Sequence, residues 1–282
     1  MFVFFYLLVI VILILHPSDT AQSALEAMRI WGGSIVPVLF PYMVFSRLLC
    51  KSLQTLALPA EPAVAALGLL GGSPSGAAMI TAYADRLSPK SLYPLCALCG
   101  TVSPMFILGT MQAWTNNESL CRRLLLCHWL CALLCAGIIR LGKRHISNRT
   151  NVPQTFESSV NPIVQSIDAI LQVGGCVICY SVLSSILAKL LRSLSLLQPL
   201  VHAMLEISGG VHAIWQSNLP FMLKCIALSA ALGFGGLSIL TQNQALLKHA
   251  GVSMRSLIGF ALIRCVLSAA LMALSQYLFP IN

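Results

Sequence analysis

The chain has 282 residues, of which 57% are hydrophobic and only 9% are charged, and its mean hydropathy is +0.86. A soluble core of this length does not need so much apolar surface, so the composition excludes an ordinary globular domain and indicates an all-α polytopic membrane protein. The net charge of +9 does not indicate nucleic-acid binding, because the basic residues are scattered and no recognition motif accompanies them. A bias of Lys and Arg toward cytoplasmic loops explains this charge better.

The N-terminal part, residues 1–27, is predicted to hold a membrane helix and a polar turn. The apolar run 1–15 has no basic residue ahead of it and only a weak cleavage site near Ala21, so we expect a short helix that is retained rather than a signal peptide. Residues 16–26 are polar and are expected to form the turn. At about 20 apolar residues per spanning helix, the whole chain has room for about eight hydrophobic segments.

The first membrane half is placed at 28–141. Its run 28–50 contains Pro37 and Pro41, each of which is expected to kink a helix. The next run, 63–84, is interrupted by Gly-Gly-Ser-Pro-Ser-Gly at 71–76. A bilayer offers no water to bare peptide groups, so broken backbone at membrane depth is tolerated only where it is buried in protein or lines a cavity.

This first break is predicted to bind a small anion. Backbone N–H groups at the start of a half-helix favour a carboxylate or a phosphate. The alternative is that glycine and serine only permit close helix packing. The candidate donors are Gly72, Ser73, Ser75 and Gly76.

A second break, Gly-Thr-Val-Ser-Pro at 100–104, interrupts the apolar run 92–111 and adds the hydroxyl groups of Thr101 and Ser103. A compact apolar segment, 124–141, follows it. The hydrophilic and basic stretch 142–162 then divides the chain near its middle.

The second membrane half, 163–282, contains two further glycine breaks, at 206–210 and 233–236. Gly71-Gly72, followed by Leu-Ser-Pro-Lys-Ser-Leu at 87–92, recurs as Gly235-Gly236, followed by Val-Ser-Met-Arg-Ser-Leu at 252–257. Paired, glycine-interrupted segments in two halves indicate a transporter site. We therefore expect two related halves with broken helices, and Gly235, Gly236 and Ser208 at the site.

Two charged residues lie within the late apolar segments, Glu206 just before Ser-Gly-Gly and Arg264 in the final segment. A charge at the bilayer centre costs about 2.5–3.5 kcal/mol on insertion scales, so such residues usually pair or function. Either the two neutralise one another as a structural pair, or Glu206 accepts a coupling proton or Na⁺ while Arg264 contacts the substrate. His202 and His212, which flank the same break, are interpreted as interfacial residues rather than as a proton relay.

The chain has eleven cysteines, and most lie in apolar segments, where a thiol behaves as a small hydrophobic group. The two C-x-x-C pairs, at 96–99 and 176–179, have no histidine cluster beside them, so we predict no metal site. No carboxylate pair, H-E-x-x-H or G-x-S-x-G motif is present, so we do not expect an enzyme.

These motifs also carry a family resemblance. The segment Gly-Ser-Pro-Ser-Gly-Ala at 72–77, with Ser-Pro-Met-Phe-Ile-Leu-Gly at 103–109, resembles the nucleoside-recognition Gate module. Leu-Glu-Ile-Ser-Gly-Gly-Val-His at 205–212, followed by Leu-Gly-Phe-Gly-Gly-Leu-Ser at 232–238, resembles the YlbJ-type (SpoVV) sporulation integral membrane proteins. The likeness runs from about Met28 to the C-terminus. The chain departs from the family pattern at Ala78, Gly100 and Thr101, where the family often has basic or amide side chains.

The resemblance implies an endospore-forming bacterium and a cell membrane, namely the outer forespore membrane. It implies a carrier that moves dipicolinic acid from the mother cell toward the forespore. The implied fold is similar to that of concentrative nucleoside transporters, with inverted repeats and re-entrant hairpins. The alternatives are a nucleoside or other small-metabolite transporter on the same scaffold and a non-transporting spore-envelope assembly protein. The expected partners are an anionic small molecule, the bilayer and a second copy in a homo-oligomer, with no cofactor apart from a coupling ion.

Overall fold

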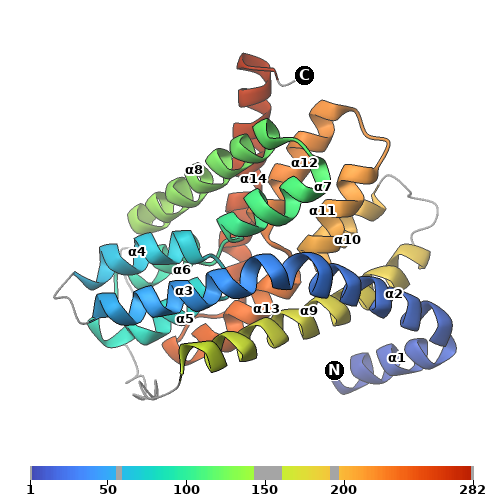
Figure 1. Ribbon diagram of the computed structural model, residues 1–282, viewed down its shortest axis with the longest axis horizontal. Coiled ribbons are helices and arrows are strands. Elements are labelled where there is room, and N and C mark those ends of the chain that lie inside the picture. Colours follow the sequence, from blue (N-terminus) through green and yellow to red (C-terminus); the bar gives the residue numbers. More distant parts are fainter. Residues whose placement is uncertain (1, 55–58, 143–160, 191–196, 281–282) are drawn as a thin grey trace.

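The computed structural model describes residues 2–54, 59–142, 161–190 and 197–280, which form helices joined by short connections, with no strand among them (Figure 1). The predicted all-α class is confirmed. In this part of the chain, five segments are long and apolar enough to cross a membrane. They are Pro17–Leu49, Glu118–Gly142, Pro162–Ala188, Phe221–Leu247 and Met254–Leu278. Among the described residues this is fewer than the roughly eight segments for which the chain has room, because several apolar runs are divided into half-helices too short to span.

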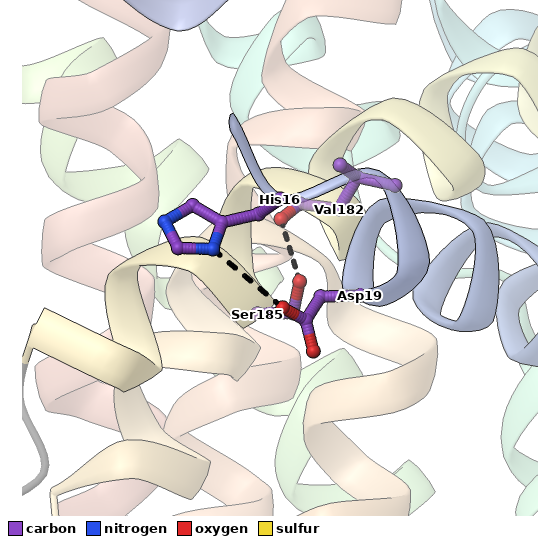
Figure 2. Close-up of polar contacts among 4 residues, drawn as sticks. All are labelled: His16, Asp19, Val182 and Ser185. Carbon is purple, nitrogen blue, oxygen red and sulfur yellow. Dashed lines mark hydrogen bonds and ion pairs between the residues drawn. The ribbon is translucent and has the colours of Figure 1, made fainter. Parts of the chain in front are cut away.

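The N-terminal residues form two helices rather than one helix and a turn. Helix α1 (Phe2–Leu15) is about 21 Å long, less than the ~30 Å hydrocarbon thickness, and doubles back beside α2 in Figure 1. Residues predicted as a polar turn form α2 (Pro17–Ile30), which has a proline in its first turn, where the missing N–H is not needed. At the corner between the helices, His16 Nδ1 lies 3.7 Å from a carboxylate oxygen of Asp19. This corner is close to Val182 and Ser185 of α9 (Pro162–Leu190) (Figure 2).

Helix α2 continues into α3 (Val36–Gln54) through a wide turn, η1 (Trp31–Ile35). Pro37 has no N–H to donate to the preceding turn, and its ring would clash with a carbonyl there. The helix widens to π-helical hydrogen bonding just before this proline and stays continuous. The segment 17–49 therefore serves as one long candidate span, so the predicted unit boundary at residue 27 falls inside a helix.

The two predicted breaks in the first half are present. Helix α4 ends at the first break and α5 begins after it; α6 ends at the second break and η3 begins after it. The long helix α8 then completes this half. The bounds are α4 (Ala60–Gly71), α5 (Ser75–Ala82), η2 (Ala84–Arg86), α6 (Leu92–Cys99), η3 (Phe106–Met111), α7 (Gln112–Thr115) and α8 (Glu118–Gly142).

The second half also contains two breaks. One was misplaced by a few residues: the chain is extended at Glu206 itself, and Gly209 and Gly210 lie inside the following helix. The other break falls at Gly235, within the predicted segment 233–236. Gly235 is in the left-handed conformation. The bounds are α9 (Pro162–Leu190), α10 (Gln198–Leu205), α11 (Ile207–Gln216), α12 (Phe221–Phe234), α13 (Gly236–Leu247), η5 (Lys248–Ala250) and α14 (Met254–Leu278).

The same order of elements occurs in each half: a long helix, a pair of half-helices, a broken helix and a final long helix. This order matches the break at Gly72 with the break at Glu206, and the break at 100–104 with that at Gly235. The Gly-Gly repeat in the sequence had matched Gly72 with Gly236 instead. In Figure 1 the α4–α5 pair and the α10–α11 pair lie on opposite sides of the molecule, with α14 between them.

Glycines allow the half-helices of the first half to approach closely. Gly72 has φ +59°, and a Cβ built there would lie 2.5 Å from the Cα atom of Ser103. A Cβ at Gly68 or Gly76 would collide with Cys99 at the end of α6. The packing interpretation of this glycine-rich segment therefore accounts for Gly72 and Gly76, where a side chain would collide with the neighbouring break.

Candidate functional site

A small cavity lies where the breaks of both halves meet. Its volume is about 40 Å³, which is room for roughly three water molecules. Its polar lining consists of Ser73, Ser103, Glu206, Ser208, Ser238 and Gln242. Its apolar lining consists of Ile35, Leu39, Val102, Phe106, Val173, Val177, Ile207 and Ile239. Residues more than 160 positions apart in the sequence thus share one polar space inside a hydrophobic bundle.

Glu206 is the residue at the break between α10 and α11. Its side chain turns back over the start of α11, where Oε1 accepts a hydrogen bond from the Ser208 N–H at 2.9 Å and Oε2 accepts one from the Gly209 N–H at 2.6 Å. A carboxylate at this position is stabilised by the two free donors and by the helix dipole. Glu206 is only 1% exposed, so these groups take the place of water around it.

Two of the predicted site serines of the first half also line the cavity. Ser73 donates its N–H to the Thr101 carbonyl at 2.6 Å and its hydroxyl to Asn243 Oδ1 at 2.7 Å. Ser103 Oγ accepts a hydrogen bond from the Phe106 N–H at 3.2 Å, which caps the start of η3. The tip of the α4–α5 pair is therefore tied both to the neighbouring break and, across the molecule, to α13.

The four other predicted residues of the first half are buried nearby but do not line the cavity. Gly72 donates its N–H to the Gly68 carbonyl at 2.8 Å. The Gly76 N–H, expected to be free for an anion, donates to the Gly72 carbonyl at 2.6 Å. The Thr101 hydroxyl donates to the Leu98 carbonyl at 3.3 Å. Ser75 Oγ is buried without a hydrogen-bond partner among the described residues.

Gly235 and Gly236 shape the second half without lining the cavity. Gly235 has φ +83° and donates its N–H to the Ala231 carbonyl, which ends α12. A Cβ on Gly236 would lie 3.2 Å from the Ile207 nitrogen, so α13 begins directly against the tip of the α10–α11 pair.

Arg264 does not pair with Glu206 and does not line the cavity, so the structural ion pair, one of the two alternatives for these residues, is wrong. Its guanidinium donates to three carbonyls: Nη1 to Ala97 at 2.9 Å, Nε to Gly233 at 3.1 Å and Nη2 to Gly100 at 3.3 Å. These carbonyls belong to the C-terminal ends of α6 and α12, where the helix dipoles favour a cation. Arg264 therefore joins the two broken helices.

Three polar residues of α13 were missed by the sequence reasoning. Ser238 and Gln242, four residues apart on one helix face, line the cavity, and Asn243 bridges Ser73 and the Gly100 carbonyl. The signal was present as Thr-Gln-Asn-Gln at 241–244, four consecutive polar residues at the end of an apolar run.

The cavity combines aliphatic walls, hydroxyl and amide groups and one carboxylate. Such a lining suits a small molecule with an apolar body and polar ends. Within the described residues, no cluster of three or more His, Cys, Asp or Glu side chains suits a metal ion. A shallower pocket of about 420 Å³ lies between α4, α6 and α8 beside Glu61 and Arg140, and none of the predicted site residues lines it.

The fold and this cavity define an all-helical integral membrane protein with broken helices at its centre. The chain is similar to the sporulation integral membrane protein YlbJ of Bacillus subtilis (strain 168). The two are 21% identical over 330 aligned positions, which cover 96% of this chain and 81% of the relative. No family model and no solved structure matches the chain.

Proposed function

We propose that this protein is a membrane transporter of a small organic anion. The observation that carries the proposal is the polar cavity formed by broken helices of both halves. Transporters place substrate between repeats at half-helix ends, where free backbone groups take the role of water. The two halves, with their matching order of elements, are proposed to be inverted repeats as in concentrative nucleoside transporters.

Dipicolinic acid is the proposed substrate. The relative is a sporulation protein, and the resemblance of the sequence motifs implies transport of this compound. Dipicolinate is a flat ring with two carboxylates, which matches aliphatic walls with hydroxyl and amide groups at their edges. We propose the outer forespore membrane as its location and the forespore as the destination of the compound.

The cavity of about 40 Å³ is smaller than such a ligand, so transport requires the cavity to enlarge. The α4–α5 and α10–α11 pairs are the proposed moving parts. Each is a pair of short helices whose tip ends at the cavity. Glu206 lies at one tip and serves as the proposed gating acid.

The test is uptake of radiolabelled dipicolinic acid by proteoliposomes that contain the purified protein. Saturable uptake above that of empty liposomes is expected, and unlabelled dipicolinate should compete better than uridine. Competition by uridine alone would assign a nucleoside carrier on the same scaffold. Absence of uptake, together with a stable complex with other spore-envelope proteins, would assign an assembly role instead.

A further inference from the structure

Glu206 is the one ionisable side chain that lines the cavity in the described part of the chain. Its carboxylate already holds the N–H groups of Ser208 and Gly209. Those are the two backbone donors at the start of α11 that a carboxylate ligand would need. An ionised Glu206 therefore binds the same two N–H groups that a carboxylate of the substrate would bind.

A carboxylate substrate in the same small space would meet a second negative charge. Two carboxylates that share a desolvated site do not both remain ionised without a compensating cation. Arg264 is committed to the carbonyls of Ala97, Gly100 and Gly233 and does not line the cavity. Protonation of Glu206 removes the repulsion and weakens its hold on the two N–H donors.

His202 lies beside Glu206 and can bring the proton. The two residues are one helical turn apart, and the backbone N–H of Glu206 donates to the His202 carbonyl at 2.7 Å. His202 Nε2 is buried and has no hydrogen-bond partner among the described residues. It is therefore open to accept or pass on a proton.

The two side chains come together at Gly209. A Cβ on Gly209 would lie 2.7 Å from His202 Nε2 and 3.4 Å from Glu206 Oε2, so both atoms pack against this residue, and only glycine leaves the His202 ring in its place. The nitrogen and the oxygen are therefore separated by no more than the sum of these two distances, and Nε2 makes no direct hydrogen bond among the described residues. One water molecule, with hydrogen bonds of about 2.8 Å on each side, can connect two atoms within this separation.

Of the other titratable groups on the surrounding helices, the Cys176 thiol of α9 lies in the neighbourhood of Glu206 and Gln242. On α11, His212 packs edge-to-face on Trp114. On α12, Lys224 donates to the Trp215 carbonyl at 2.8 Å. Asp168 of α9 and Glu26 and Arg29 of α2 are exposed on the outer faces of their helices.

We propose that His202 and Glu206 form a water-bridged proton-carrying pair, and that each anion crosses together with a proton held on Glu206. The proton enters on Nε2 of His202 and moves through the water to Oε2 of Glu206. The neutral acid then releases the Ser208 and Gly209 donors to a carboxylate of the substrate. Return of the empty carrier requires loss of that proton, which restores the ionised Glu206 cap. This inference rests on the proposed transport function and specifies its coupling ion.

The test compares two rates in the same proteoliposomes, with labelled dipicolinate as the probe. One is net uptake driven by an alkaline lumen, and the other is exchange of labelled for unlabelled dipicolinate without a gradient. In the wild type, the gradient should raise net uptake at least fivefold, and a trapped pH dye should report lumen acidification when dipicolinate is added. His202→Gln should lower the ratio of gradient-driven uptake to exchange at least fivefold.

Gly209→Ala is a second variant for the same step, because its added Cβ would lie 2.7 Å from Nε2 and force the His202 ring to shift, and it should lower the ratio in the same way. Two control variants should leave the ratio unchanged: His212→Gln, on the same pair of half-helices but packed edge-to-face against Trp114, and Cys176→Ala. Three outcomes would overturn the proton-carrying pair without overturning transport. They are wild-type uptake that does not change with the pH gradient, uptake that responds to a Na⁺ gradient instead, and an unchanged ratio in His202→Gln. Neither exchange nor uptake in the wild type would overturn the transport function and this inference together.

Discussion

The two buried charges of the membrane region, Arg264 and Glu206, look alike in the sequence and differ in the structure. Both are almost fully buried, with exposed fractions of 2% and 1%. Arg264 lies at the C-terminal ends of two half-helices, and three of its nitrogens donate to carbonyls. Glu206 lies at the N-terminal end of one half-helix, accepts two hydrogen bonds and faces a cavity.

The difference separates a structural charge from a functional one. Arg264 donates to three carbonyls and does not line the cavity, so moving it would take donors away from carbonyls in an apolar interior. Glu206 is held by donors that another anion can take over, next to a space that can enlarge. Helix ends of opposite polarity thus give the two residues opposite roles, and substitutions at each residue test this difference.

The largest effect is expected for Arg264→Met. The change removes three hydrogen bonds to buried carbonyls, of which that of Gly100 keeps a bond from Asn243, and each buried acceptor left unsatisfied costs about 1–3 kcal/mol. The variant should lose most of its folded yield and unfold at a clearly lower temperature. Heating of the detergent-solubilised protein followed by size-exclusion chromatography measures this, with Arg255→Met on the exposed start of α14 as the control. A stable Arg264→Met protein that fails only in transport would instead make Arg264 a substrate contact.

The next effect is expected for Glu206→Ala, and it should fall on transport. Loss of the helix cap costs only about 1 kcal/mol, so the protein should remain inserted and folded. Dipicolinate uptake should fall at least tenfold, because the proton-accepting group is gone. Glu118→Ala, which removes an exposed carboxylate paired with Arg122 at 2.9 Å, is the control. Full uptake by Glu206→Ala would remove Glu206 from the mechanism.

A smaller effect is expected for Gly72→Ala at the tip of the α4–α5 pair. A side chain at φ +59° is strained and its Cβ would meet the Ser103 backbone, so stability should fall by about 2 kcal/mol. Gly137→Ala on α8 is the matched control, because a Cβ there meets nothing within 4 Å. The measurement is the melting temperature of the two variants, and that of Gly72→Ala should be lower. Equal melting temperatures would mean that the tip can move away from Ser103 without loss of stability.

The sequence predicted where the helices break, and the structure confirms breaks near all four glycine-rich segments. Glycine and proline act on the local backbone, so their effect can be read from neighbouring residues. The partners of Glu206 and Arg264 could not be read in this way. They depend on which helix ends meet in space, and a charge in an apolar segment is equally consistent with an ion pair and with capping by backbone groups.

The site was predicted in part for the same reason. Ser73, Ser103, Glu206 and Ser208 lie at breaks, and the structure brings them to one cavity. Ser238 and Gln242 lie inside a regular helix, where no break marks them, and only the folded chain shows which face of α13 turns inward. Gly76 and Thr101 were assigned as ligand contacts, but the N–H of Gly76 and the hydroxyl of Thr101 are used within their own turns.

The smallest effect is expected for Ser73→Ala, which tests whether the first half takes part in binding. The variant loses the hydroxyl bond to Asn243 Oδ1 and keeps the backbone bond to Thr101, so stability should fall by about 1 kcal/mol. If the hydroxyl also contacts the anion, the KM for dipicolinate should rise about three- to tenfold, since one lost hydrogen bond is worth about 0.5–1.5 kcal/mol. Ser185→Ala is the control, because that hydroxyl bonds only to Val182 within α9 (Figure 2). Equal KM values in the two variants would confine substrate recognition to the second half, and Glu206, Ser208 and α13 would then carry binding on their own.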